Sequence, residues 1–177
     1  MKEKNIYLIG FMGAGKSTLA PKLADNLGLD WVDTDDLIEE KEGLSIPEIF
    51  EYYGEDRFRE LEREVIEEVS RSEPKVVAVG GGAPMDEANW KLMKSTGEVV
   101  YLEIGPEEVL GRVGSDENRP LLSGLNRVER KEKINKLLKI RHPRYNKADY
   151  VVLCNGTGTA ALAEEVTHKL MEENEPG

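Results

Sequence analysis

Cysteine, long hydrophobic runs and a secretory leader are scarce or missing in this sequence. A single cysteine, Cys154, can neither form an internal disulfide nor build a metal site alone, and we expect it to be a small buried strand residue. No apolar run approaches the roughly 20 residues that a membrane-spanning helix needs. Glycines interrupt the apolar start of the chain, and no cleavage site follows it. We therefore expect a cytoplasmic protein that spans no membrane.

Basic residues are also outnumbered. The chain has 24 lysines and arginines against 35 aspartates and glutamates, which gives a formal net charge of -11. Nucleic acids are held by clustered basic side chains, so this balance predicts no nucleic-acid partner, although a small anion can still bind in a locally basic pocket. The length of 177 residues suits one domain with a substantial core. We expect residues 1–177 to form that domain and the protein to be a monomer.

Short apolar runs alternate along the chain with stretches of helical periodicity. The runs typical of strands cover residues 4–10, 29–33, 75–79, 98–104 and 149–154. The helical patterns cover residues 17–29, 45–54, 55–71, 85–96, 105–113, 127–148 and 159–174. This order predicts an α/β fold, a parallel sheet joined by right-handed crossovers with helices on both faces. In such sheets ligands bind beyond the carboxyl ends of the strands.

Capping and turn residues predict several helix ends. Ser45 and Glu48 form a capping-box pair ahead of a helix that we expect to end by Gly54. Pro106 stands where a first helical position would be, and Pro143 is expected to end the basic helix that begins near residue 127. Residues 114–126 are rich in Gly, Ser, Asn and Pro, which predicts a mobile loop between two helices.

The strongest motif is a glycine-rich loop between the first predicted strand and the first predicted helix. Residues 10–17 read GFMGAGKS and match G-x-x-x-x-G-K-[ST] in the structural context that this pattern requires. Gly13 and Gly15 allow successive N–H groups to turn toward phosphate oxygens, and the positive end of the next helix adds to the attraction. Lys16 can reach the β and γ phosphates, and the Ser17 hydroxyl suits Mg²⁺. The chain is therefore predicted to bind a nucleoside triphosphate.

Nucleotide binding leaves three classes of protein open. These are a kinase for a small molecule, a GTPase switch and a nucleotide-dependent binding module without turnover. Residues 146–149 read NKAD and match the guanine-reading N-K-x-D of GTPases, but they end a predicted helix instead of following a strand. The only D-x-x-G, residues 25–28, lies inside the first helical unit. The positions of these two matches in the chain therefore disfavour a GTPase switch.

An acidic stretch follows the second predicted strand, beside the glycine-rich loop. Asp33 ends that strand, from where it can hold Mg²⁺ through a water molecule. Asp35 can accept a proton or a hydrogen bond from an acceptor hydroxyl, as a kinase requires. Asp36, Glu39 and Glu40 fall in the first turns of a predicted helix, where negative charge is favourable, and we expect them to be solvated.

Glycines and arginines supply further candidates for an acceptor site. Gly80–Gly82 follow a predicted strand directly, which lets a ligand touch bare backbone, although a plain flexible turn has the same sequence. Arg59 lies three residues before Glu62 on one helix, so the glutamate can orient the guanidinium. Arg119 lies in the predicted mobile loop and Arg141 near a helix end. Arginine suits a carboxylate or a phosphate, but composition alone does not select these three.

Several motifs together resemble those of one family of small-molecule kinases. In order, they are GFMGAGKST, DTDDLIE, SIPEIF, GEDRFRELE, VVAVGGG, VVYLE, RPLL and IRHPRY, and they span most of the chain. In order and spacing they resemble the shikimate kinase family. The resemblance implies a P-loop kinase fold with a five-stranded parallel sheet of order 2-3-1-4-5. It also implies transfer of the γ-phosphate of ATP, with Mg²⁺, to the 3-hydroxyl of shikimate, a step of chorismate and aromatic amino acid biosynthesis.

The resemblance also implies a role for individual residues. The catalytic residues would be Asp35, Lys16 and Arg119. The shikimate-binding residues would be Asp35, Arg59, Gly80, Gly81, Gly82 and Arg141, beside an apolar wall of Phe50 and Phe58. The nucleotide-binding residues would be Gly13, Ala14, Gly15, Lys16, Ser17, Thr18, Arg112 and Arg119. Ser17 would bind Mg²⁺ directly and Asp33 through water, and a lid would extend over about residues 112–126.

The sequence departs from the family pattern in two places. Residues 154–159 read CNGTGT where some members carry a basic residue that contacts adenine, and the lid matches poorly outside RPLL. The nearest alternative is another small-molecule kinase of this fold, for gluconate or a nucleoside monophosphate. A GTPase switch or a binding module without catalysis is the more distant alternative.

Overall fold

One parallel β-sheet organises the molecule. The computed structural model describes residues 4–113, 119–154 and 156–172. Five strands run in parallel in the order β2-β3-β1-β4-β5, which confirms the predicted order. The strands are β1 (Asn5–Gly10), β2 (Asp30–Asp33), β3 (Lys75–Ala78), β4 (Gly97–Glu103) and β5 (Tyr150–Leu153). The sheet and its crossovers have the architecture of a P-loop kinase.

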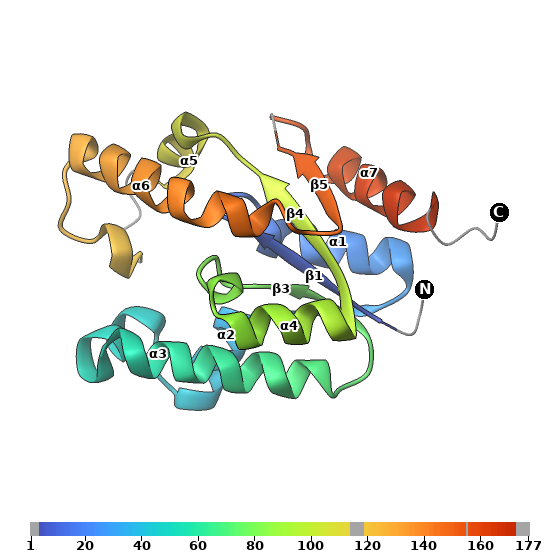
Figure 1. Ribbon diagram of the computed structural model, residues 1–177, viewed down its shortest axis with the longest axis horizontal. Helices are drawn as coiled ribbons and strands as arrows, with labels where there is room; N and C mark the ends of the chain where they lie inside the picture. Colours follow the sequence, from blue (N-terminus) through green and yellow to red (C-terminus); the bar gives the residue numbers. More distant parts are fainter. Residues whose placement is uncertain (1–3, 114–118, 155, 173–177) are drawn as a thin grey trace.

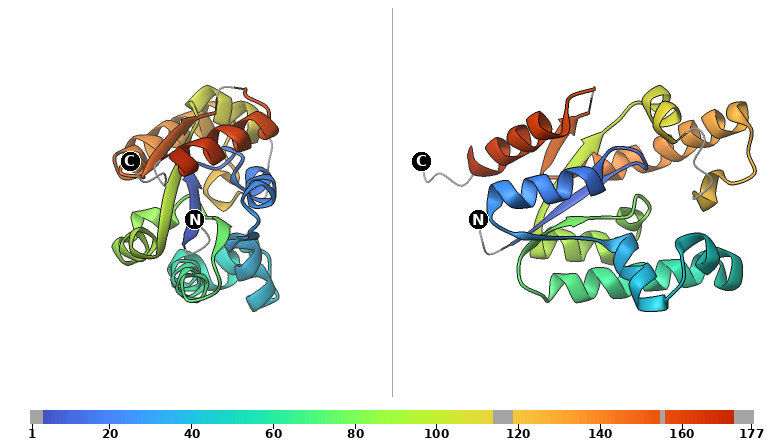
Figure 2. Two further views of the ribbon diagram at one scale, coloured as in Figure 1. Left: turned by 90° about the vertical axis from the view of Figure 1, so that its right-hand side faces the viewer. Right: turned by 180° about the vertical axis from the view of Figure 1, so that it is seen from behind.

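Helices cover both faces of the sheet, as predicted. They are α1 (Lys16–Leu27), α2 (Thr34–Glu42), α3 (Ile46–Ser70), α4 (Glu87–Thr96), α5 (Pro106–Val113), α6 (Arg127–Tyr145) and α7 (Thr159–Glu172), with short 3₁₀ turns η1 (Ala83–Met85) and η2 (Pro120–Leu122). In Figure 1, α3, α4 and α6 lie in front of the sheet. Seen from behind in Figure 2, α1 and α7 lie side by side over the opposite face. Within the described ranges, no helix is both long and apolar enough to span a membrane.

The central strand shows why this arrangement is stable. Every residue of β1 is buried, and successive side chains enter different hydrophobic clusters. Ile6 and Leu8 join the cluster on the α1 and α7 side, whereas Tyr7 and Ile9 join the cluster on the α3 and α4 side. A strand that is apolar on both faces is buried only between two layers of helices, so the β1 sequence requires the three-layer fold.

The predicted helix ends are largely confirmed. The Ser45 hydroxyl accepts a hydrogen bond from the Glu48 N–H at 3.4 Å, and the Glu48 carboxylate accepts one from the Ser45 N–H at 2.8 Å. Gly54 has φ 80° and ψ 174°, so it interrupts α3 and separates a short first part from a long second part. The prediction that Pro143 ends its helix is wrong, because α6 continues to Tyr145. Proline lacks an N–H, so Pro143 near the carboxyl end of α6 removes only one helical hydrogen bond, and the helix continues past it.

Candidate active site

Two cavities adjoin at the carboxyl ends of the strands. One has a volume of about 480 Å³ and lies between α2, α3, the Gly80–Gly82 segment and η2. The other has a volume of about 320 Å³ and surrounds the glycine-rich loop and the start of α1. Both are lined by Met12, Asp35, Gly80, Gly81 and Arg119. We call the first the acceptor cavity and the second the phosphate cavity, and these five residues form their boundary.

The glycine-rich loop has the backbone geometry that its sequence predicts. Gly13 and Gly15 have φ values of 78° and 95°, in the left-handed region that side chains avoid. A Cβ atom on Gly13 would lie 3.0 Å from Val113, so the loop also packs tightly against α5. Gly15 caps α1 without a side-chain hydrogen bond, which leaves the first N–H groups of the helix directed at the phosphate cavity.

Lys16 is held at this loop by main-chain oxygens. Its Nζ atom donates to the carbonyl oxygens of Gly10 at 2.8 Å and Phe11 at 3.1 Å. Burial lowers the pKa of Lys16 to about 8, while Asp35 and Asp33 oppose that shift. The ammonium group is therefore largely protonated at neutral pH, and it lies in the cavity where a phosphate would need a positive charge.

The other predicted nucleotide-binding residues surround the same cavity. The Ala14 N–H donates to the Phe11 carbonyl at 3.1 Å, which closes the turn of the loop. Thr18 lines the cavity from the first turn of α1. Arg112 donates to the Gly13 carbonyl at 2.8 Å and pairs with Glu108 on its own helix. The start of α1 and the end of α5 therefore both border the phosphate cavity.

Ser17 and Asp33 fit a magnesium site. The Ser17 hydroxyl donates to the Asp33 carboxylate, so the two predicted metal-binding residues lie in contact. Hydroxyl and carboxylate oxygens are ligands that Mg²⁺ accepts, and the ion commonly keeps several waters and binds substrate phosphates. Within the described ranges, no group of three or more His, Cys, Asp or Glu residues could hold a metal by itself. A cation here would therefore depend on nucleotide phosphates for part of its coordination.

Asp35 lies at the boundary of the two cavities, and its environment differs from that of a solvated carboxylate. Its N–H donates to the Asp33 carboxylate at 2.8 Å, the N-cap contact of α2. The Asp35 Oδ1 atom is buried and has no hydrogen-bond partner among the described residues. Burial raises the pKa of Asp35 to about 6, and Asp33 adds to the shift, whereas Lys16 and Arg119 oppose it. The carboxylate also lines both cavities, so it is placed to accept a hydrogen bond or a proton from a bound hydroxyl.

The neighbouring acids only partly follow their predicted role. Asp36 and Glu40 are exposed, as expected for solvated helix residues. The prediction that Glu39 is merely solvated is wrong, because its carboxylate accepts a hydrogen bond from the Ile46 N–H at 2.7 Å. This contact satisfies a free N–H at the start of α3, where helices leave such donors unpaired. Glu39 therefore connects α2 to α3 at the mouth of the acceptor cavity.

The glycine triplet is required for space and is not a plain turn. The backbone has no positive φ at Gly80, Gly81 or Gly82. A Cβ atom on Gly80 would lie 2.7 Å from Glu62 Oε2 and 3.0 Å from Asp35 Oδ1. Both carboxylates therefore approach the same peptide closely, at a distance that any side chain on Gly80 would prevent.

The other two glycines approach two arginines in the same way. A Cβ atom on Gly81 would lie 3.2 Å from the Arg141 guanidinium, and one on Gly82 would lie 2.5 Å from that of Arg59. The three glycines thus bring bare backbone against the charged groups that line the acceptor cavity, from α2, α3 and α6.

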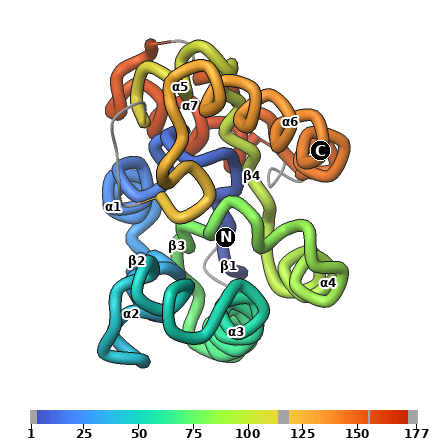
Figure 3. The backbone as a smooth tube through the Cα atoms, turned by 90° about the vertical axis from the view of Figure 1, so that its left-hand side faces the viewer, coloured from blue at the N-terminus to red at the C-terminus, as the bar shows by residue number. Residues whose placement is uncertain are grey.

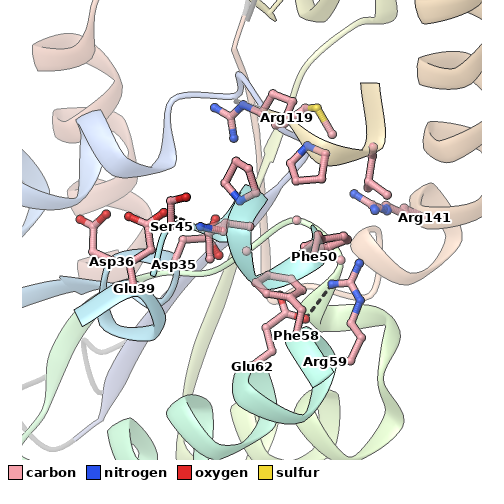
Figure 4. Close-up of a pocket in the computed structure, with 18 residues that line it drawn as sticks. Asp35, Asp36, Glu39, Ser45, Phe50, Phe58, Arg59, Glu62, Arg119 and Arg141 are labelled. Atoms are coloured by element: carbon pink, nitrogen blue, oxygen red, sulfur yellow. Dashed lines mark hydrogen bonds and ion pairs between the residues drawn. The ribbon is translucent and has the colours of Figure 1, made fainter. Parts of the chain in front are cut away.

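The arginines of the acceptor cavity are fixed by partners. Arg59 donates to Glu62 at 2.7 Å and to Glu55 at 3.0 Å, so Glu62 orients the guanidinium as predicted. Glu62 is 1% exposed, and burial raises its pKa to about 7 while Arg59 opposes the shift. Arg141 is 5% exposed and lies over the Phe11 ring, 5.3 Å from its centroid. Figure 4 shows both guanidinium groups at the cavity, with Glu62 beside Arg59.

Apolar side chains and the segment after residue 119 complete the acceptor cavity. The rings of Phe50 and Phe58 lie 4.9 Å apart and form one wall, as predicted. Pro120 and Leu121 of η2 line the opposite side together with Arg119. Figure 3 looks onto this end of the molecule, where the segment from residue 119 (gold) lies between α5 and α6 on one side and α2 and α3 on the other.

The structure agrees that the NKAD match does not read guanine, and it adds one residue that the sequence did not single out. Asp149 of the NKAD match accepts a hydrogen bond from the Val99 N–H at 2.8 Å and pairs with Lys94. It precedes β5, so it lies at the amino end of the sheet, remote from the phosphate cavity, and guanine reading there is excluded. Tyr145, which the sequence did not single out, donates from its hydroxyl to the Gly81 carbonyl. Its signals in the sequence were its place at the end of the IRHPRY motif and the spacing of four residues from Arg141 on a helix.

Comparisons with known proteins agree with this geometry. A model of the shikimate kinase family matches residues 12–173. The shikimate kinase of Sulfurihydrogenibium sp. (strain YO3AOP1) is 43% identical over 94% of this chain and 98% of the relative. That of Moorella thermoacetica is 42% identical over 94% of each chain. The solved shikimate kinase from Acinetobacter baumannii, in complex with shikimate, is 39% identical, has a TM-score of 0.93 and covers 98% of this chain and 96% of that one. With a matching family model, whole-length relatives and the same fold, this chain belongs to the shikimate kinase family.

Proposed function

We propose that this chain transfers the γ-phosphate of ATP to the 3-hydroxyl of shikimate, which yields shikimate 3-phosphate and ADP for chorismate biosynthesis. The observation that carries the proposal is the shared boundary of the two cavities, where Asp35 and Arg119 border both. A phosphoryl donor and an acceptor hydroxyl must meet in line, and adjoining cavities with a carboxylate and a cation at their junction supply that arrangement.

On the donor side, the main-chain N–H groups of Gly13, Ala14 and Gly15, with Thr18, would bind the phosphates of ATP. Lys16 would exchange its carbonyl partners for the β and γ phosphates, because both lie within reach of the same loop. Mg²⁺, bound by Ser17 and through water by Asp33, would neutralise phosphate charge. Arg112 would contact the nucleotide from the end of α5.

On the acceptor side, two arginines would bind the shikimate carboxylate. Arg59 and Arg141 both line the acceptor cavity, and a guanidinium offers two parallel donors to a carboxylate. The bare backbone of Gly80–Gly82 would allow the substrate to lie close to the peptide groups. Phe50 and Phe58 would contact the apolar side of the ring.

In the transfer itself, the 3-hydroxyl oxygen would bond to the γ-phosphorus while the bond from that phosphorus to the bridging oxygen of ADP breaks. Asp35 would accept the hydroxyl proton or the hydrogen bond on its carboxylate, because Asp35 lines both cavities. Lys16 and Arg119 would stabilise the charge on the transferring group, because both cations lie at the phosphate cavity.

We further propose that residues 112–126 act as a lid that closes over both substrates. Residues 114–118 of that segment lie outside the described residues, but Arg119, Pro120 and Leu121 already line the acceptor cavity. A closing lid would exclude water from the phosphoryl group. We also propose that residues 1–177 form a single kinase domain that acts as a monomer in the cytoplasm.

An acceptor panel tests the proposed reaction. The purified protein would be given ATP and Mg²⁺ with shikimate, gluconate or AMP, and ADP release would be followed with a coupled assay. We expect turnover with shikimate alone. Turnover with gluconate or AMP instead would indicate another small-molecule kinase, and nucleotide binding without acceptor-dependent ADP would indicate a binding module.

A further inference from the structure

Tyr145 is a buried polar side chain for which the proposed reaction has no role. It is fully buried at the end of α6, one helical turn after Arg141. Its hydroxyl donates to the main-chain carbonyl of Gly81, the central glycine of the triplet, 64 residues away in the sequence. Tyr145 lines neither of the two cavities, so any effect that it has on a substrate must act through another group.

Three groups converge at Gly81. A Cβ atom built there would lie 3.2 Å from the Arg141 guanidinium, 3.2 Å from the Gly10 carbonyl and 3.6 Å from the Tyr145 hydroxyl. Arg141 and Gly81 both line the acceptor cavity, whereas Gly10 begins the glycine-rich loop. The Tyr145 hydroxyl therefore lies behind the place where the acceptor side and the phosphate side of the site meet.

The core holds this hydroxyl in place. The ring of Tyr145 contacts that of Tyr101, with the centroids 5.0 Å apart and the planes tilted by 40°. Tyr101 belongs to β4, where it pairs in register with Ile9 of β1. Burial raises the pKa of Tyr145, so the hydroxyl keeps its proton and remains a donor at neutral pH, with Arg141 opposing the shift. The Tyr145 hydroxyl is therefore available as the donor to the Gly81 carbonyl at neutral pH.

We propose that Tyr145 is a positioning residue that fixes the Gly81 peptide and, with it, the place of the Arg141 guanidinium in the acceptor cavity. This inference rests on the proposed function. Without the hydroxyl, the Gly81 carbonyl loses the side-chain donor that Tyr145 supplies. The peptide and the adjacent guanidinium then gain freedom, and the loss falls on binding of the acceptor carboxylate. We expect transfer itself to be spared, because the Tyr145 hydroxyl donates to Gly81 and not to Asp35 or Lys16.

Tyr145→Phe tests the proposal, because it removes the hydroxyl and keeps the ring that contacts Tyr101. We expect KM for shikimate to rise about tenfold, while kcat and KM for ATP stay within about twofold, as for loss of uniform binding energy. Direct titration with shikimate should show the same loss. A 4-aminophenylalanine placed at position 145 keeps a donor at the ring edge and should restore most of the affinity.

Tyr7→Phe is a matched control. Tyr7 is also fully buried, and its hydroxyl bonds to Thr96 at 2.8 Å and to Asn5 at 3.0 Å, away from both cavities. Both variants should lower the melting temperature by a similar amount, but Tyr7→Phe should leave KM for shikimate unchanged.

Three results would overturn the inference: an unchanged KM in Tyr145→Phe, an equal rise of KM in Tyr7→Phe, or a melting temperature far below that of the control. The last result would assign Tyr145 a purely structural role. If the unmodified protein fails to release ADP with shikimate, the proposed function fails instead, so the two failures are distinguishable.

Discussion

The glycine triplet offers a prediction whose size follows from the structure. A Cβ atom on Gly82 would lie 2.5 Å from Arg59 Nη1, 2.8 Å from Nη2 and 2.9 Å from Cζ. Gly82 has φ -85° and ψ -19°, which alanine adopts without strain. Gly82→Ala is therefore compatible with the backbone, and the three atoms nearest its added Cβ all belong to the guanidinium of Arg59, which must move.

The displacement sets the expected effect. Ordinary contact begins at 3.4 Å, so the guanidinium must move by about 1 Å from a position 2.5 Å away. That motion opposes its hydrogen bond to Glu62 at 2.7 Å and misaligns it with a bound carboxylate. A hydrogen bond to a charged group contributes about 1.5–3 kcal/mol, so we expect KM for shikimate to rise about 10- to 100-fold. The rise should come with little change in kcat, because Arg59, which we propose binds the acceptor, lines the acceptor cavity and not the phosphate cavity.

Steady-state kinetics with a matched variant measure this effect. Gly105→Ala is the control, since a Cβ atom there would have no neighbour within 4 Å among the described residues. Both variants should melt near the temperature of the unmodified protein, and only Gly82→Ala should lose affinity for shikimate. An unchanged KM in Gly82→Ala would refute the reasoning, because it would mean that Arg59 does not bind the acceptor.

Four further predictions concern charged groups of the site. Asp35→Asn should lower kcat by about 10²- to 10⁴-fold if the carboxylate takes the proton, whereas a rise in KM alone would make Asp35 an anchor. A general base must be ionised, and the pKa of Asp35 is raised to about 6, so kcat/KM of the unmodified enzyme should decrease as the pH is lowered past about 6. A flat pH profile from pH 5 to 8 would contradict this expectation. Arg119→Ala should lower kcat in a single-turnover assay, and normal turnover would remove Arg119 from the transfer step. Burial raises the pKa of Glu62 from 4.5 to about 7, so its contribution to the free energy of unfolding is present below pH 4.5 and lost as the pH rises through about 7. Denaturant melts should therefore show a decline in stability over that pH window, and Glu62→Gln should reduce the decline. Equal declines in the two proteins would contradict this prediction.

The glycine-rich loop and the sheet were predictable because their signals are local or periodic. The motif at residues 10–17 lies within one turn of chain, and the alternation of apolar runs with helices requires a parallel sheet. The strand order came from the family resemblance, since periodicity does not specify which strands are neighbours. Asp33 and Asp35 could be distinguished from the acids after them because Asp33 ends β2 and Asp35 follows it within two residues, beside the glycine-rich loop.

The rest of the site depends on contacts between distant segments. No spacing rule indicates that the Tyr145 hydroxyl reaches Gly81, because that contact follows from how α6 crosses the end of β3. Glu39 looked like a solvated helix acid because its partner, the Ile46 N–H, belongs to the next helix. The role of the glycine triplet was open for the same reason, since the carboxylates and guanidiniums that require bare backbone come from other elements.

The identity of the product tests the central claim most directly. The protein would be incubated with ATP, Mg²⁺ and shikimate, and the phosphorylated product would be located by ³¹P–¹H correlation NMR, with ADP measured in the same sample. The account predicts one phosphate on the 3-hydroxyl of shikimate for each ADP released. A phosphate on another hydroxyl, or ADP release that does not depend on shikimate, would contradict it.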